Sequence, residues 1–372
     1  MSHSSLHHRP QFLSYLKDRL RRDGSSSRFE YINAAYYPSW RVYRGQLPSS
    51  LNLRIISHVF YAFLRAHEDG TIYFLDEHAD TQIRVNGESG CLNAFKKLKK
   101  ENPHLKIILS VGGSSGSSTF PAFAAQEASR RTFASTSRQV VERYGFDGID
   151  VDWEHPSNPK QGEDYVKLLS TLREYLPSPR FLLTSALPVG EWCLSNIDLR
   201  ATSQHCDFIN LMTYDFAGSW TELSGHQAQL TSPPNPPNAF ARRSVENGVD
   251  YLQAHGVSSG KTLIGIPVYG RSFLGVTGTG QPFTGHGGED GIFEYKDLPR
   301  PGTQENIDME RCAAFCVGGD GGFVTYDNPE TVQMKAKYVK DHKIAGLFYW
   351  TGTFDADPPR SLVATGYKYL NS

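Results

Sequence analysis

The chain repeats one pattern eight times, a short apolar run followed in most cases by an amphipathic segment. This alternation is typical of β/α units, in which helices cover the strands of a parallel sheet. Eight parallel strands favour closure into a (β/α)8 TIM barrel over an open doubly wound sheet, which usually has fewer strands. The predicted strands span residues 31–37, 56–63, 106–111, 148–153, 181–187, 208–214, 262–269 and 344–350.

Helices are predicted before four of these strands, at 90–101, 129–144, 163–175 and 243–255. The pattern breaks at residues 272–327, a long Gly-rich stretch without a clear helical period. Because a plain loop of that length is improbable inside a compact domain, we expect a small inserted subdomain between strands seven and eight, with short strands of its own. The barrel should then comprise residues 29–271 and 328–372, with a helix over 329–342 leading back to it.

The charge balance excludes some classes of partner. With 38 basic and 39 acidic side chains, the formal net charge of −1 offers no basic surface for a nucleic acid or an anionic membrane. Aromatic residues make up 12% of the chain, and without net charge they suit a neutral sugar polymer, because pyranose rings lie flat on Trp and Tyr. No stretch of about twenty apolar residues is present to span a membrane.

The N-terminal segment and the cysteines bear on cellular location. Residues 1–28 should form a tail or a short helix over 11–22, and they lack the apolar core of a signal peptide. We therefore expect an intracellular protein, with non-classical export as the alternative.

Five cysteines, an odd number, leave at least one unpaired and favour a reducing compartment. Cys312 and Cys316 have no second Cys/His pair near them, so packing or a local bridge is expected there and no metal site.

Three acidic residues, Asp150, Asp152 and Glu154, follow one another at intervals of two at the end of the fourth predicted strand. Strand alternation points all three the same way, and the active face of a parallel barrel lies at these strand ends. Three converging acids cannot all ionise cheaply, so a shared proton and a raised pKa are expected. A solvated acidic edge or a cation site is the alternative, which the apolar intervening residues disfavour. The same alternation should point His155 away from the acid.

The segment Asp147-Gly-Ile-Asp-Val-Asp-Trp-Glu154 resembles the signature of family 18 glycoside hydrolases, the chitinase family. The resemblance extends from about residue 31 to the C-terminus. Further matching segments occur in the family's order: Ser-Val-Gly-Gly at 110–113, Met-Thr-Tyr-Asp at 212–215, Tyr-Gly-Arg at 269–271, and Trp350. The insertion at 272–327 looks like the small α+β insertion domain of one branch of this family.

The resemblance implies a substrate-assisted mechanism. Glu154 would protonate the glycosidic oxygen while the acetamido oxygen of the sugar attacks the anomeric carbon, giving an oxazolinium ion that water opens with retention. Asp152 would turn between Asp150 and the substrate and hold the acetamide N–H. Tyr214 would donate its hydroxyl to the acetamido oxygen. No cofactor and no metal are implied.

Other residues are predicted to bind the sugar chain. Trp350 should form the floor of the subsite beside the cleaved bond, with a buried core Trp as the alternative. Asp215 and Arg271 should form an ion pair at the rim or contact sugar hydroxyls, and Met212 should shape the wall by packing. We predict that three further aromatic residues form cleft walls and further subsites, namely Tyr37, Phe63 and Trp220. The alternative is that they are packed aromatics at the barrel end.

The expected function is hydrolysis of β-1,4 linkages in chitin or N-acetylglucosamine oligosaccharides by a monomer. A chitin-binding lectin on the same barrel is the competing class, and such relatives typically lose the proton donor, which Glu154 supplies here. An endo-β-N-acetylglucosaminidase acting on N-glycans is the competing enzyme. The long insertion favours the chitinase branch.

Overall fold

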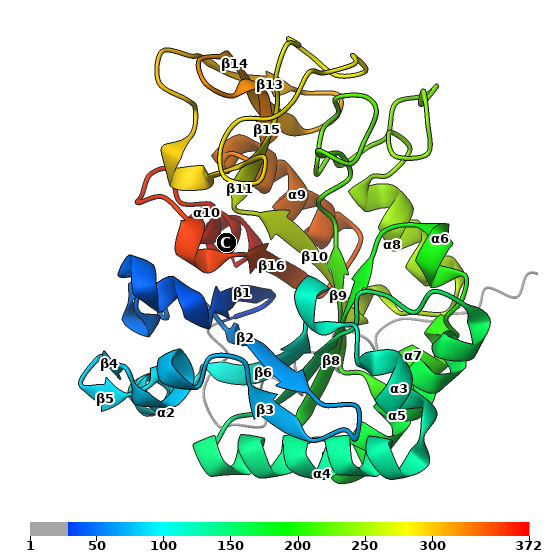
Figure 1. The fold of residues 1–372 in the computed structure, drawn as a ribbon. Coiled ribbons are helices and arrows are strands. Elements are labelled where there is room, and N and C mark those ends of the chain that lie inside the picture. The colour runs from blue at the N-terminus through cyan, green and yellow to red at the C-terminus, as the bar shows by residue number, and fades with distance from the viewer. Residues whose placement is uncertain (1–28, 372) are drawn as a thin grey trace, which may run out of the picture.

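Residues 29–371 are described by the structure, a computed structural model, and they fold around a closed parallel barrel (Figure 1). Because β1 pairs in parallel with both the second and the last strand, the sheet has no open edge there, and the predicted (β/α)8 barrel is confirmed. The barrel strands are β1 (Ile32–Pro38), β2 (His58–Ala66), β6 (Lys106–Gly112), β7 (Gly148–Asp152), β8 (Leu182–Pro188), β9 (Phe208–Met212), β10 (Thr262–Pro267) and β16 (Gly346–Trp350).

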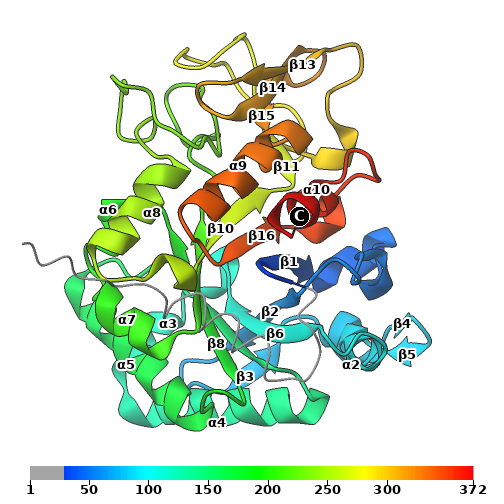
Figure 2. The same ribbon diagram turned by 180° about the vertical axis from the view of Figure 1, so that it is seen from behind.

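Helices cover the outer face of the barrel, as the view from behind shows (Figure 2). Five of them begin at a side chain that accepts a hydrogen bond from a backbone N–H of the first turn, the caps being Asn158, Asp198, Ser244, Asn328 and Ser361. The helices are α2 (Cys91–Glu101), α3 (Phe120–Ala125), α4 (Glu127–Tyr144), α5 (Pro159–Tyr175), α6 (Glu191–Leu194), α7 (Leu199–His205), α8 (Val245–Ala254), α9 (Pro329–Asp341) and α10 (Leu362–Leu370). The predicted helices match to within a few residues, and the one over 11–22 lies outside the described residues.

Alternation along the strands separates two hydrophobic clusters. On β1, Ile32, Ala34 and Tyr36 contribute to a small cluster inside the barrel, whereas Ala35 and Tyr37 join the larger cluster that includes the helices. The parity of a residue in its strand therefore decides whether its side chain can reach the active face.

A second sheet, entirely antiparallel, lies beside the barrel at the upper end of the view in Figure 1. Its strands run in the order β12 (Ile292–Glu294), β11 (Tyr269–Phe273), β15 (Gly322–Tyr326), β14 (Ala313–Gly318) and β13 (Glu305–Asp308). Its helical part is the single 3-10 helix Tyr295–Asp297. Short antiparallel strands also occur near the second barrel strand, β3 (Ile72–Phe74), β4 (Arg84–Val85) and β5 (Glu88–Ser89).

A buried ion pair joins the second sheet to the barrel. Asp327 directly follows β15, and Lys335 of α9 places its Nζ 2.8 and 2.6 Å from the two carboxylate oxygens. The same Nζ donates to the carbonyl of Ala228 at 2.6 Å, and both ionic side chains are almost fully buried, at 0% and 1% exposure. The lysine thus saturates its three donors inside the protein.

No helix within residues 29–371 is long and apolar enough to cross a membrane. All five cysteines are buried and free, so the local bridge considered for Cys312 and Cys316 is not formed. Cys316 packs instead on strand β14.

Candidate active site

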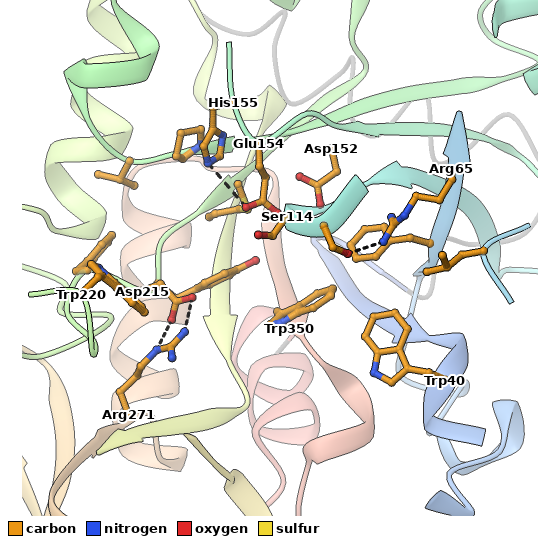
Figure 3. A pocket seen from close by; sticks show the side chains of 18 of the residues that line it. Trp40, Arg65, Ser114, Asp152, Glu154, His155, Asp215, Trp220, Arg271 and Trp350 are labelled. Atoms are coloured by element: carbon orange, nitrogen blue, oxygen red, sulfur yellow. Dashed lines mark hydrogen bonds and ion pairs between the residues drawn. The ribbon is translucent and has the colours of Figure 1, made fainter. Parts of the chain in front are cut away.

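A cleft of about 1130 Å³ opens at the carboxyl ends of the barrel strands (Figure 3). Nine of the residues predicted from the sequence line it, and a tenth, Asp150, lies directly beneath it. Those on the lining are Phe63, Asp152, Glu154, Met212, Tyr214, Asp215, Trp220, Arg271 and Trp350. These residues lie toward or beyond the carboxyl ends of different barrel strands, so segments far apart in the sequence meet at this face.

Asp150 lies beneath the cleft with no exposed surface and accepts four hydrogen bonds. The donors are Tyr36 Oη at 2.9 Å, Ser110 Oγ at 2.7 Å, Thr184 Oγ1 at 2.7 Å and Asn210 Nδ2 at 3.3 Å. Burial raises the pKa of Asp150, and the first three hydrogen bonds oppose that shift because they favour the ionised form. The sequence prediction missed Tyr36, Thr184 and Asn210. Polar side chains at inward positions of otherwise apolar strands are the signal that could have found them.

Asp152 lies one step above Asp150 and is 4% exposed. Its Oδ1 is buried and has no hydrogen-bond partner among the described residues. Burial raises the pKa of Asp152 well above its ordinary value, and the negative charges of Glu154 and Asp150 raise it further. Both effects favour the protonated form of Asp152, because a proton there relieves the repulsion among the three acids.

Of the three acids Asp150, Asp152 and Glu154, the last faces the cleft most openly, with a quarter of its side chain exposed. Its backbone N–H donates to Ser117 Oγ at 2.7 Å, which holds the chain just beyond β7. Burial, and then the negative charge of Asp215, raise the pKa of Glu154 from 4.5 to about 7. A carboxylic acid with a pKa near 7 is half protonated near neutral pH, so it can both donate and accept a proton.

His155 also lines the cleft, so the prediction that it points away from the acid is wrong. Its Nε2 lies 3.8 Å from Glu154 Oε2. Alternation fails here because β7 ends at Asp152, before the histidine. Burial lowers the pKa of His155 to about 4, so the ring is neutral at neutral pH and does not act as a second cation beside Glu154.

The ring of Tyr214 crosses the barrel end over β10. Gly265 makes this possible, because a Cβ at that position would lie 2.6 Å from the Tyr214 ring. The phenol packs edge-on against Tyr269 and Phe348, and its hydroxyl makes no hydrogen bond with any residue in the described part of the chain. Burial raises the pKa of Tyr214 well above 10, so the hydroxyl keeps its proton and remains a donor to a ligand.

Asp215 and Arg271 form the predicted ion pair, a two-pronged one with both N···O distances at 2.8 Å. Tyr269 Oη donates to the same carboxylate at 2.6 Å. The guanidinium also lies 4.5 Å from the centroid of the Trp220 ring, which leaves the indole 46% exposed at the cleft edge. The pair therefore supports an exposed aromatic surface on one side of Glu154 (Figure 3).

A row of aromatic rings extends on the other side. Trp350 and Phe63 are roughly parallel at a centroid distance of 5.7 Å, and Phe63 and Trp40 follow at 6.2 Å. Trp40 is 40% exposed on the 3-10 helix Ser39–Arg44. Such a row presents successive flat surfaces to a chain of pyranose rings. Sequence reasoning missed Trp40, as it missed the exposed Trp192, since both lie in short helices outside any recognised motif.

Tyr37 does not belong to the cleft, contrary to its prediction as a wall residue. It is fully buried, its hydroxyl donates to the carbonyl of Gln46 at 2.8 Å, and it packs in the cluster outside the barrel. The inward residue is its neighbour Tyr36, so an error of one position in strand parity explains the mistake.

No group of three or more His, Cys, Asp or Glu side chains within residues 29–371 is arranged to hold a metal ion. Asp150 and Asp215 are instead engaged with hydroxyl, amide and guanidinium donors. These contacts suit proton transfer and charge stabilisation by the protein's own groups.

The sequence matches the family described as Glycosyl hydrolases family 18 over residues 32–355. The chain belongs to glycosyl hydrolase family 18. This family 18 hydrolase is 34% identical over 369 residues to Chitinase 1 of Aphanocladium album, covering 92% of the chain and 86% of that protein. It is 30% identical over 396 residues to Sporulation-specific chitinase 2 of Saccharomyces cerevisiae, covering 90% and 76%.

Solved structures agree with the assignment. The family 18 hydrolase has a TM-score of 0.83 and 28% identity with Ostrinia furnacalis Group IV chitinase in complex with allosamidin, covering 91% of this chain and 98% of that one. With chitinase ChiA74 from Bacillus thuringiensis the TM-score is 0.83 at 26% identity, covering 91% and 69%. The predicted family and enzyme class are thereby confirmed, and the protein is a glycoside hydrolase.

Proposed function

We propose that this family 18 hydrolase is a chitinase that cleaves β-1,4 linkages between N-acetylglucosamine units, with retention of configuration and with the substrate's acetamido group as the nucleophile. The observation that carries the proposal is that Glu154, Asp152 and Tyr214, whose hydroxyl has no partner in the described part of the chain, line one aromatic cleft. The two relatives from Aphanocladium album and Saccharomyces cerevisiae are both named chitinases, which supports chitin as the substrate.

The protein's own carboxylates are poorly suited to be the nucleophile. Asp152 neighbours Glu154 on the same strand end, and burial together with the charges of Glu154 and Asp150 raises its pKa well above the ordinary value, which weakens it as a nucleophile. Asp215 is held by Arg271 and by Tyr269 Oη, which occupy its oxygens and stabilise its charge. A two-carboxylate mechanism needs a free carboxylate across the scissile bond, so an attacking group from the substrate is the remaining choice.

Binding orients that group. A sugar stacked on Trp350 directs its acetamide toward Asp152 and Tyr214, since these side chains line the cleft beside the indole. The Tyr214 hydroxyl donates to the acetamido oxygen, and the unpartnered Oδ1 of Asp152 accepts from the acetamido N–H. Both contacts hold the carbonyl oxygen at the anomeric carbon and raise its effective concentration.

Glu154 then transfers its proton to the glycosidic oxygen. The C1–O bond breaks, the acetamido oxygen forms a bond to C1, and the positive charge is spread over an oxazolinium ring. The carboxyl groups of Asp152 and Asp150 stabilise that charge as it develops. Once the leaving group departs, ionised Glu154 accepts a proton from water, whose oxygen opens the ring and restores the acid.

Glu154→Gln tests the proposal, with the exposed Glu163→Gln on α5 as the matched control. On a chromogenic chitotrioside, the wild type and Glu163→Gln should turn over, and Glu154→Gln should lose about 10³-fold or more in kcat. NMR of the first product should show the β-anomer, as retention requires. A wild-type protein that binds chitin oligomers without turnover would identify a lectin and overturn the proposal.

A further inference from the structure

The cleft contains three arginines, and two of them are engaged by the protein. Arg271 is paired with Asp215. Arg65 donates to the carbonyl of Gly112 and to Ser115 Oγ at 2.7 Å. The guanidinium of the third, Arg243, has no hydrogen bond or ion pair within the described part of the chain, although its side chain lines the cleft.

Arg243 is held by packing. Its guanidinium carbon lies 4.6 Å from the centroid of the Phe240 ring, a contact that fixes one face of the group. Burial lowers the pKa of Arg243, and no neighbouring carboxylate offsets the lost hydration. An arginine remains charged despite such a shift, so an uncompensated positive charge faces the cleft.

Trp192 lies beside it. A Cβ built on Gly190 would be 2.7 Å from the Trp192 indole and 3.6 Å from Arg243 Nε, so the two side chains flank this glycine. Trp192 is 53% exposed and packs edge-on against His155 at a centroid distance of 5.2 Å. Arg243 and Trp192 together form an aromatic surface with a cationic donor at its edge.

This surface lies on the leaving-group side. Glu154 is 3.8 Å from His155 and responds to the charge of Asp215, so the acid faces the half of the cleft that holds Trp192 and Trp220. The row from Trp350 to Trp40 occupies the other half (Figure 3). Because the acid must contact the departing oxygen, the leaving sugars occupy the half with Arg243.

We propose that Arg243 determines specificity by excluding deacetylated sugars from the leaving-group subsites, an inference that rests on the proposed function. A guanidinium offers only donors, which match an acetamido carbonyl or a hydroxyl oxygen. A glucosamine unit presents a protonated amine there, which is a donor with the same charge. Repulsion between like charges in a partly desolvated site opposes binding of that unit.

The test is the pattern of products from a partly deacetylated chitosan of known acetyl content, sequenced by mass spectrometry after labelling of the reducing ends. In wild-type products, glucosamine should be depleted about tenfold, relative to the polymer, at one of the two sugars next to the new non-reducing end. Arg243→Gln should remove this depletion. Arg243→Lys, which keeps the charge, should retain it, and so should Arg242→Gln, an exposed neighbour outside the cleft.

The new reducing end separates this inference from the proposed function. If the acetamido group is the nucleophile, every variant must produce N-acetylated reducing ends, and glucosamine at that position would overturn the proposed function. If reducing ends are acetylated but wild-type and Arg243→Gln products carry the same sugars at the new non-reducing end, the role of Arg243 is refuted. Loss of the depletion in Arg243→Lys would also refute it, since the charge would then not be the cause.

Discussion

Replacing Asp215 with Asn tests the electrostatic origin of the raised pKa of Glu154. That pKa rises from 4.5 to about 7, with burial as the larger cause and the negative charge of Asp215 as the second. A pKa difference of about 2.5 corresponds to about 3.4 kcal/mol in favour of the protonated form. Since Asp215 supplies the smaller share, its removal should lower the pKa by about one, or about 1.4 kcal/mol.

The direction of the pH effect follows from the role of Glu154 as the acid. Its protonated form is the active one, so kcat/KM of the wild type should fall as pH rises through about 7. In Asp215→Asn, the fall should begin near pH 6. At pH 8 the variant should therefore retain about one tenth of the fraction of plateau activity that the wild type retains. Arg271, left without its partner, acts in the same direction because it favours the ionised acid.

The assay is kcat/KM against pH on a chromogenic chitotrioside. Asp320→Asn is the matched control, because Asp320 forms a similar two-pronged pair with Arg300, at 2.8 and 2.7 Å, in the second sheet away from the cleft. Its profile should match that of the wild type. If Asp215→Asn still hydrolyses the substrate with an alkaline limb near pH 7, the charge of Asp215 does not set the pKa of Glu154.

Two further substitutions test the fold and the substrate's orientation. Lys335→Met should lower the free energy of unfolding by about 3–5 kcal/mol in urea titrations, because it leaves the carboxylate of Asp327 buried and unpaired. Lys337→Met, which breaks an exposed pair on the same helix, should cost under about 0.5 kcal/mol; equal costs for the two would contradict the argument. Tyr214→Phe should lower kcat on the chitotrioside about 100-fold with little change in KM. Tyr73→Phe, at an exposed tyrosine outside the cleft, is its control, and an unchanged kcat in Tyr214→Phe would remove the hydroxyl from the mechanism.

Local patterns predicted most of the fold. Each barrel strand was found to within a few residues because a strand buried on both faces appears as an apolar run bounded by turns. An insertion over residues 272–327 was predicted because that part of the sequence lacks a helical period, and most strands of the antiparallel sheet lie in it. Its five-stranded order, with β11 beginning at Tyr269, could not be predicted, since pairing between short antiparallel strands depends on contacts distant in the sequence.

The candidate site divides in the same way. Asp150, Asp152 and Glu154 were predicted together because two-residue spacing on one strand already aligns them. The errors at Tyr37 and His155 arose where that local rule was applied with the wrong parity or beyond the end of the strand. Nothing local distinguishes Tyr36 from Tyr37, and only barrel closure turns the first toward Asp150 and the second toward α2 and Gln46.

The sequence by itself determined the barrel, the position of the acid and the family, because each is encoded in short-range periodicity or in contiguous motifs. The tertiary structure decided what surrounds the acid. Burial and the charge of Asp215 bring the pKa of Glu154 to about 7. Segments far apart in the chain bring Trp40, Trp192 and Arg243 to one cleft. Desolvation and charge act through space, so they depend on which segments meet and not on their order in the chain.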